Sequence, residues 1–175
     1  MSVLSDVELT IHKFLQSVPD LPKDSQKLLA ENAWLFTLIG VFLAALSVPF
    51  YINLLQLALE VSPGFSGYFV STGYGNPWTF AAVVSVFFTV VASIIAATAI
   101  SPLKQLERRG WEILFIVLVV NAVEVVFKSF IDFDLFGFFF AILVGLLGLG
   151  ISAYFLFQIR PYFKSVKIVK STIKK

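Results

Sequence analysis

Cysteine is absent from this 175-residue sequence, histidine occurs once, and charged residues make up only 14% of the chain. The lack of cysteine excludes disulfides, thiolate metal ligands and cysteine nucleophiles, and a single histidine leaves no candidate metal cluster. We therefore expect neither a metal nor a cofactor. A soluble domain has about a quarter of its residues charged, whereas this chain is 58% hydrophobic with a mean hydropathy of +0.91. The composition predicts a protein whose solvent is lipid.

Four apolar stretches are long enough to cross a bilayer as helices, for which about 20 residues are needed. They cover residues 34–59, 77–100, 111–130 and 135–159. The links between them are the uncharged, glycine-rich residues 61–76, a basic turn at 101–110 and a short connection at 131–134. We predict an all-α, four-helix transmembrane bundle in which residues 34–160 form the membrane domain.

Twelve of the thirteen Lys and Arg residues lie on one side of this four-span arrangement, and only Lys128 lies on the other. Cytoplasmic segments of membrane proteins carry an excess of Lys and Arg. The partition therefore predicts that both termini are cytoplasmic. The net charge of only +2, gathered at the chain ends and in one loop, is typical of a membrane protein and not of a nucleic-acid binder.

Tryptophan at the predicted span boundaries agrees with these limits. Trp34 and Trp111 stand at the inner boundary of the first and third spans, and Trp78 stands at the outer boundary of the second. The indole ring is apolar but its N–H needs a polar partner, so tryptophan favours the membrane interface. We expect all three to act as interfacial anchors.

Residues 1–33 form a predicted cytoplasmic arm. Residues 5–8 match a capping box, and apolar residues then recur at helical spacing opposite charged ones as far as Val18. This pattern predicts an amphipathic helix that ends before Pro19 and lies on the inner leaflet or covers a partner. A second helix is expected to begin near Pro22 and to run into Trp34.

The tail, residues 161–175, is basic and has two alternatives. Its lysines recur every three or four residues, and apolar side chains from Phe163 to Ile173 recur on another face. A helix after Pro161 would direct the lysines toward anionic lipid headgroups; these are Lys164, Lys167, Lys170 and Lys174. The other alternative is a disordered end that serves only to set topology.

Polar residues within the spans are the candidate carriers of any activity, because they are expensive to place in lipid. They fall on one face of the first span and one face of the third, at similar depth, and we predict a polar cluster beneath the outer surface. Its members are Asn53, Gln56, Glu60, Asn121, Glu124 and Lys128. A structural interpretation pairs Glu124 with Lys128 at i,i+4 and uses the amides to join helices. A functional interpretation makes Glu124 a proton- or cation-binding carboxylate in a transport path.

Small residues at four-residue spacing predict close helix packing, because membrane helices approach through small side chains. The predicted contact positions are Ala81, Ser85, Thr89, Ser93 and Ala97 in the second span and Gly137, Ala141 and Gly145 in the fourth. No paired catalytic groups or nucleophile–base arrangement stand out in the sequence, so we expect a protein that is not an enzyme.

Two segments carry a family resemblance. Arg108-Arg109-Gly110-Trp111 precedes the third span, and Phe157-Gln158-Ile159-Arg160 followed by Tyr162 and Lys164 closes the fourth. Both segments resemble those of small bacterial four-helix integral membrane proteins of no known activity. The resemblance implies the four-span layout and a location in the bacterial plasma membrane.

The sequence therefore supports two functional hypotheses. The first is a membrane scaffold or accessory subunit that acts through helix packing and surface contacts, with anionic membrane lipids and a membrane-protein partner or a second copy as its partners. The alternative is a small ion or solute transporter or channel that is assembled as an oligomer around Glu124.

Overall fold

The computed structural model describes residues 3–15, 17–60, 77–131 and 135–164, and helices account for nearly all of them. A short helix, α1 (Val3–Leu15), precedes four long ones. These are α2 (Lys23–Glu60), α4 (Pro77–Lys104), α5 (Arg108–Ile131) and α6 (Leu135–Ile159), and a 3-10 turn, η2 (Arg160–Tyr162), follows α6. The amphipathic helix and the four spans predicted from the sequence are all present as helices.

Each of the four long helices is apolar enough and long enough to cross a membrane. The shortest, α5, has 24 residues, or about 36 Å at a rise of about 1.5 Å per residue, against a hydrocarbon core of roughly 30 Å. The protein is an all-α, multi-pass membrane protein, as predicted. The helix predicted to begin near Pro22 and to run into Trp34 is confirmed as the first part of α2, which begins at Lys23 and continues through the first span. At its start the Gln26 N–H donates to the Pro22 carbonyl oxygen (3.0 Å).

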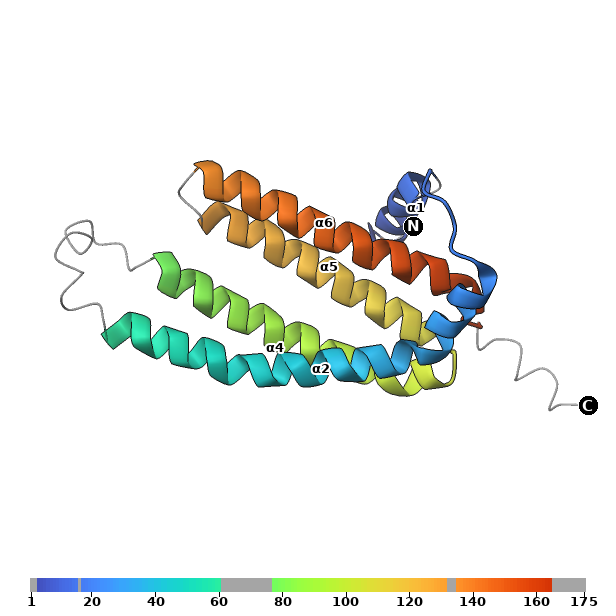
Figure 1. Cartoon of the computed structure of the whole chain (residues 1–175), viewed down its shortest axis with the longest axis horizontal. Helices are drawn as coiled ribbons and strands as arrows, with labels where there is room; N and C mark the ends of the chain where they lie inside the picture. Colours follow the sequence, from blue (N-terminus) through green and yellow to red (C-terminus); the bar gives the residue numbers. More distant parts are fainter. Residues whose placement is uncertain (1–2, 16, 61–76, 132–134, 165–175) are drawn as a thin grey trace, which may run out of the picture.

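The long helices pack in chain order, each against the next (Figure 1). α2 packs on α4, α4 on α5 and α5 on α6, whereas α2 and α6 make few contacts with each other. The start of α2, the turn between α4 and α5 and the close of α6 lie at one end of the bundle, with α1 beside α6 at that end (Figure 1). We refer to this end as the basic end and define it as residues 19–34, 99–115 and 153–164.

The buried hydrophobic core of the described residues lies at the basic end, apart from Leu118, which is one turn further along α5. Its members come from all four long helices and from Phe163: Ala30, Ala33, Ala99, Leu103, Trp111, Phe115, Leu118, Ala153, Leu156, Ile159 and Phe163. α5 contributes the aromatic rings of Trp111 and Phe115, whereas α2, α4 and α6 contribute only alanine, leucine and isoleucine side chains. Among the described residues, the buried hydrophobic side chains therefore gather near the charged end of the bundle.

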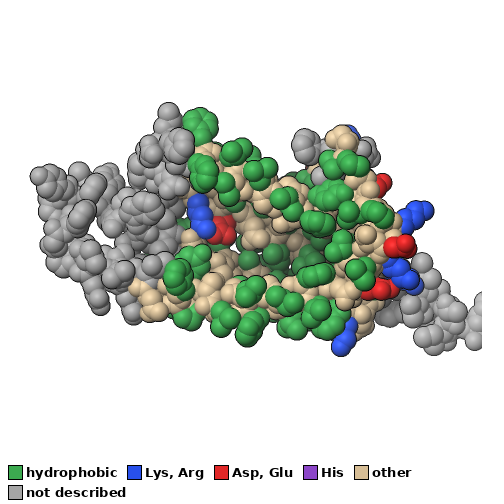
Figure 2. Space-filling view, viewed as in Figure 1, with side chains coloured by type: hydrophobic (Ala, Val, Ile, Leu, Met, Phe, Trp, Pro, Cys, Tyr) green, Lys and Arg blue, Asp and Glu red, His purple; other side chains and the backbone are tan. Residues whose placement is uncertain are grey.

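Large hydrophobic side chains cover the outside of the bundle between its ends. Figure 2 shows them along the helices, with most charged side chains of this face gathered at the basic end. On α2, Phe36, Phe42 and Phe50 are each more than half exposed, and on α6 the same holds for Phe139 and Leu146. Lipid tails are as apolar as these side chains, so a helix bundle in a membrane gains nothing by turning them inward.

Candidate functional site at the basic end of the bundle

The predicted polar cluster is only partly assembled within the residues whose side chains are described. Lys128 and Glu124 of α5 form an i,i+4 ion pair, with 2.5 Å between Nζ and Oε1, and the Glu124 side chain is only 16% exposed. Asn121 lies one turn earlier on the same face and is half-buried. This part of the predicted cluster is therefore a charged pair on one helix.

The remaining members of the predicted cluster are on α2. Asn53 is exposed, and it falls three residues after Phe50 and seven after Leu46, which are both exposed as well. These spacings place Asn53 on the outward face of α2, away from the face that packs on α4. Gln56 and Glu60 belong to α2, but their side chains lie outside the described part of the chain.

The predicted small-residue positions are buried to different degrees. Ser85 is buried and Ser93 is half-buried, whereas Ala97 is exposed. The Ser93 hydroxyl donates to the Thr89 carbonyl oxygen of its own helix (2.6 Å). On α6, a Cβ added at Gly145 would collide with the side chain of Val125 of α5. The side chains of Ala81 and Ala141, and the surroundings of Gly137, lie outside the described residues.

A row of polar side chains at the close of α6 and in η2 holds the N-terminal arm. Tyr154 and Gln158 are four residues apart and share one face of α6, and Tyr162 of η2 follows four residues later. The Tyr154 hydroxyl donates to the Pro19 carbonyl oxygen (2.8 Å), and the Tyr162 hydroxyl donates to that of Lys23 (3.0 Å). This row therefore binds the segment that connects α1 to α2.

Gln158, the middle residue of the row, makes the most contacts. Its Oε1 accepts from Gln26 Nε2 at 2.8 Å and from the Leu21 N–H at 3.4 Å, and its Nε2 donates to Asp20 Oδ1 at 3.0 Å. Gln26 Nε2 also donates to the Leu21 carbonyl oxygen (2.9 Å). Both the oxygen and the nitrogen of the Gln158 side-chain amide therefore form hydrogen bonds with the arm. These bonds orient the start of α2 against α6.

Helix α1 is attached to the same end by charge. Glu8 forms an ion pair with Arg160, whose guanidinium also lies 5.2 Å from the centre of the Trp111 ring. Ile11 packs against the buried core. The apolar stripe predicted for this helix is therefore directed in part at the bundle, while Leu9 stays more than half exposed.

The structure corrects the expectation that Trp111 is an interfacial anchor. Trp111 is 1% exposed, its ring stacks on Phe115 at 5.5 Å, and Phe157 contacts it edge-on at 5.6 Å. Its Nε1–H donates to the Leu156 carbonyl oxygen of α6 (2.7 Å). The indole N–H obtains its polar partner inside the protein, so the ring has no need of the headgroup region. Trp34 is half-buried beside Lys104, whose ammonium lies 5.2 Å from the centre of the indole ring. The side chain of Trp78 is not among those that the structure describes.

The turn between α4 and α5 meets the end of the described chain at the basic end. Lys164 donates its N–H to the Leu106 carbonyl oxygen and accepts from the Arg108 N–H, both at 2.9 Å. Leu106 has a φ of 53°, a left-handed conformation that turns the chain from α4 into α5. A Cβ at Gly110 would lie 2.7 Å from the backbone nitrogen of Leu103, so this close approach requires glycine.

A tail helix after Pro161, one of the two alternatives for residues 161–175, does not begin at Phe163. Phe163 has φ −91° and ψ 118°, which is extended backbone, and its ring is buried in the core. The bonds from Lys164 to the α4–α5 turn hold the chain extended where a helix would need to form. The side chain of Lys164 is exposed, whereas Lys167, Lys170 and Lys174 lie outside the described residues.

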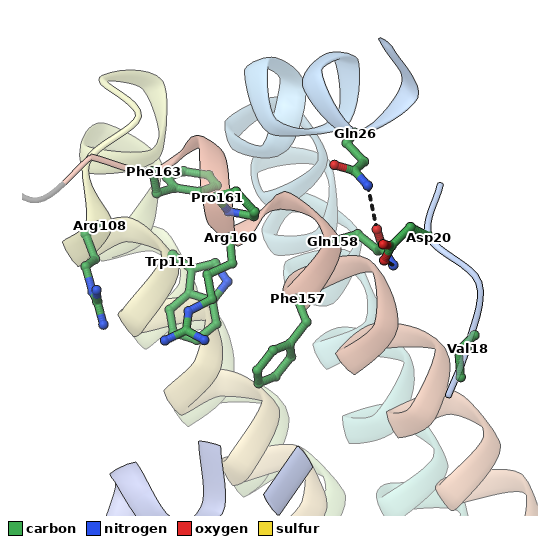
Figure 3. A pocket seen from close by; sticks show the side chains of 10 residues that line it. All are labelled: Val18, Asp20, Gln26, Arg108, Trp111, Phe157, Gln158, Arg160, Pro161 and Phe163. Atoms are coloured by element: carbon green, nitrogen blue, oxygen red, sulfur yellow. Dashed lines mark hydrogen bonds between the residues drawn. The ribbon is translucent and has the colours of Figure 1, made fainter. Parts of the chain in front are cut away.

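A cavity of about 650 Å³ opens at the basic end (Figure 3). Charged, amide and apolar side chains from the arm, α2, α5, α6 and η2 line it: Val18, Asp20, Gln26, Arg108, Trp111, Phe157, Gln158, Arg160, Pro161 and Phe163. Arg108 and Arg160 lie on one side of the view in Figure 3, with Asp20, Gln26 and Gln158 on the other. Among the residues described, no three His, Cys, Asp or Glu side chains are grouped as a metal site would need.

Comparisons with protein-family models, with curated proteins and with solved structures found no match to this chain. The basic end was missed as a site by reasoning from the sequence. The four-residue spacing of Tyr154, Gln158 and Tyr162 was a signal for a shared polar face at the close of α6, but the positions that this face contacts are more than 130 residues earlier in the chain.

Proposed function

We propose that this protein is a non-enzymatic scaffold or accessory subunit of the bacterial plasma membrane, with both termini in the cytoplasm. The orientation is supported by the positive charges, because every described Lys and Arg except Lys128 belongs to the arm or to the basic end. A membrane protein directs such a cluster to the cytoplasm.

The network of Tyr154, Gln158, Tyr162 and the Glu8–Arg160 pair is the observation that carries the scaffold proposal. These polar side chains of the basic end join the arm to the bundle. Such a network rigidifies a surface, and a rigid cytoplasmic surface suits the binding of another protein. The exposed Lys164 and the lysines that follow it in the sequence would add attraction to an anionic leaflet.

Purification from native membranes tests this function. The full chain is tagged at its C-terminus, cross-linked in intact cells and isolated in a mild detergent. A second membrane protein in constant stoichiometry, lost when Gln158→Leu disrupts the basic end, is the expected result. Recovery of the chain by itself from cross-linked cells would contradict the scaffold role.

The Glu124–Lys128 pair favours a second candidate, a small transporter or channel. A carboxylate at 16% exposure within a spanning helix is the type of group that binds protons or cations in transport paths. If this candidate is correct, the protein is a homo-oligomer, and its reconstitution into liposomes gives a cation- or proton-dependent flux. Glu124→Gln should then abolish the flux while the oligomer remains intact.

A further inference from the structure

We propose that the cavity at the basic end binds the phosphate group of an anionic phospholipid from the adjoining leaflet. This site does not depend on whether the protein is a scaffold or a transporter. The candidate spans of α5 and α6 are residues Arg108–Ser129 and Ile142–Tyr162. Arg108 begins the first of these segments and Arg160 lies two residues before the end of the second, near the level at which lipid phosphates lie in a bilayer.

The chemistry of the lining fits an amphiphile with an anionic head. Arg108 and Arg160 bring two guanidinium groups to the cavity, and Asp20 is the one carboxylate of the lining. Guanidinium groups match the geometry of phosphate oxygens and bind them with paired N–H donors. Helix α5 begins at Arg108, so the positive end of its dipole lies at the same place. Phe157 and Val18 add apolar surface that can contact the glycerol and upper acyl carbons.

Some N–H donors of the cavity lining are available to bind such a ligand. Arg108 uses Nε to bind Glu112 at 3.1 Å, and its side chain is 46% exposed. The terminal nitrogens of Arg108 have no partner within the described part of the chain. Asp20 is directed to Gln158 Nε2 at 3.0 Å, which holds this carboxylate away from the arginines (Figure 3). A volume of about 650 Å³ lies within the usual range of small-molecule sites, and it suits a headgroup with part of the glycerol.

Glu8 acts as an internal competitor in this proposal. Its carboxylate pairs with Arg160 from α1, so a lipid phosphate that contacts Arg160 must share or displace it. The proposal therefore predicts opposite effects on lipid affinity for the two partners of one ion pair. Loss of Arg160 weakens binding, and loss of the Glu8 charge strengthens it. If the Glu8–Arg160 pair had a purely structural role, the two substitutions would not change lipid affinity in opposite directions.

Native mass spectrometry of the full chain in a neutral detergent tests the site, with phosphatidylglycerol as the probe and phosphatidylcholine as its zwitterionic counterpart. We expect one phosphatidylglycerol to bind severalfold more tightly than phosphatidylcholine. Arg108→Gln should weaken that binding by about tenfold, the loss of one charge-assisted contact. Arg109→Gln is the matched control, because Arg109 is the neighbouring exposed arginine and does not line the cavity. It should leave the affinity within about twofold of that of the unchanged chain, since exposed charges contribute little.

Four results would overturn the proposal. The first is equal affinity for the two lipids, and the second is an equal loss in the Arg108→Gln and Arg109→Gln variants, which would mean diffuse surface attraction. The third is displacement of phosphatidylglycerol by inorganic phosphate at an equal concentration, which would assign the site to a soluble phosphate compound. The fourth is weaker binding, or no change, in Glu8→Gln, where a severalfold gain is expected. Arg108→Gln breaks only an exposed ion pair, so the test does not depend on whether Arg160→Gln folds.

Discussion

Gly145 and Gly148 of α6 are three residues apart but have different surroundings. A Cβ on Gly145 would collide with the branched side chain of Val125, whereas a Cβ on Gly148 would meet no atom within 4 Å. Valine is stiff at χ1, so Val125 cannot easily rotate away. We therefore expect Gly145→Ala to lower the free energy of unfolding by about 1–3 kcal/mol, the usual effect of overpacking.

Gly148→Ala is the control for this prediction. It adds the same methyl group to the same helix in open surroundings and should leave stability unchanged or raise it slightly, since alanine favours helix over glycine. Thermal unfolding of the two variants in one detergent provides the measurement. Equal stability of both variants would mean that α5 and α6 do not approach each other closely at Gly145.

The Glu124–Lys128 pair allows a test of the structural interpretation. Glu124→Gln should lower the free energy of unfolding by about 1–3 kcal/mol because it leaves the Lys128 charge with a weaker partner. Adding Lys128→Met should recover part of that loss, and denaturation of the single and double variants measures the coupling. A double variant no more stable than Glu124→Gln would indicate that the pair does not stabilise the fold.

Glu112→Gln provides the comparison. It breaks an ion pair of the same i,i+4 spacing on the same helix, with Arg108, but both side chains are about half exposed. Exposed pairs contribute about 0–1 kcal/mol, so this variant should differ little from the unchanged protein.

At the scale of elements, the attachment of the arm depends on one face of α6. Gln158→Leu removes the contacts to Asp20, Leu21 and Gln26, and leaves the donors of the arm without their acceptor. Residues 3–26 should then exchange their backbone amide hydrogens faster, because opening of the arm is no longer opposed by these bonds. Hydrogen exchange followed by mass spectrometry measures this, and amides in the middle of α6 should be unaffected.

Gln105→Leu is the matched substitution, because Gln105 is exposed in the α4–α5 turn. It should leave exchange in the arm unchanged. If exchange of residues 3–26 does not respond to Gln158→Leu, the arm is held by α1 itself and by the Glu8–Arg160 pair. Tyr154→Phe, which deletes only the hydroxyl bonded to Pro19, should give a smaller effect in the same direction.

The whole molecule has an orientation that labelling can measure. Ser66 falls between α2 and α4, and Ser171 follows Lys164 in the tail. The chain has no native cysteine, so any labelling of a variant with one introduced cysteine occurs at that position. With both termini cytoplasmic, the Ser66→Cys variant should react with an impermeant thiol reagent in intact cells, and Ser171→Cys should react only after lysis. The reverse pattern would overturn the orientation.

The four long helices could be predicted because they depend on local properties, although α4 continues to Lys104 and α5 begins at Arg108, within the stretch expected to be a turn. About 20 consecutive apolar residues must be helical in lipid, where a backbone polar group without a partner is too costly. Pro22 stops the preceding segment and permits a helix to begin at Lys23. The surroundings of each face were harder to predict, since spans that are apolar on all sides have no hydrophobic stripe to indicate which side faces a neighbour.

The sequence by itself determined that the chain is a four-span helical membrane protein and that its positive charges gather at one end, because span length, hydropathy and charge are properties of single segments. Only the tertiary structure decided which residues meet. It placed Trp111 inside the core, joined Gln158 to residues 20–26 and opened a cavity that Arg108 and Arg160 line together with Asp20. The physical reason is that these contacts join segments far apart in the chain. No local pattern records which helix face will lie opposite a given side chain.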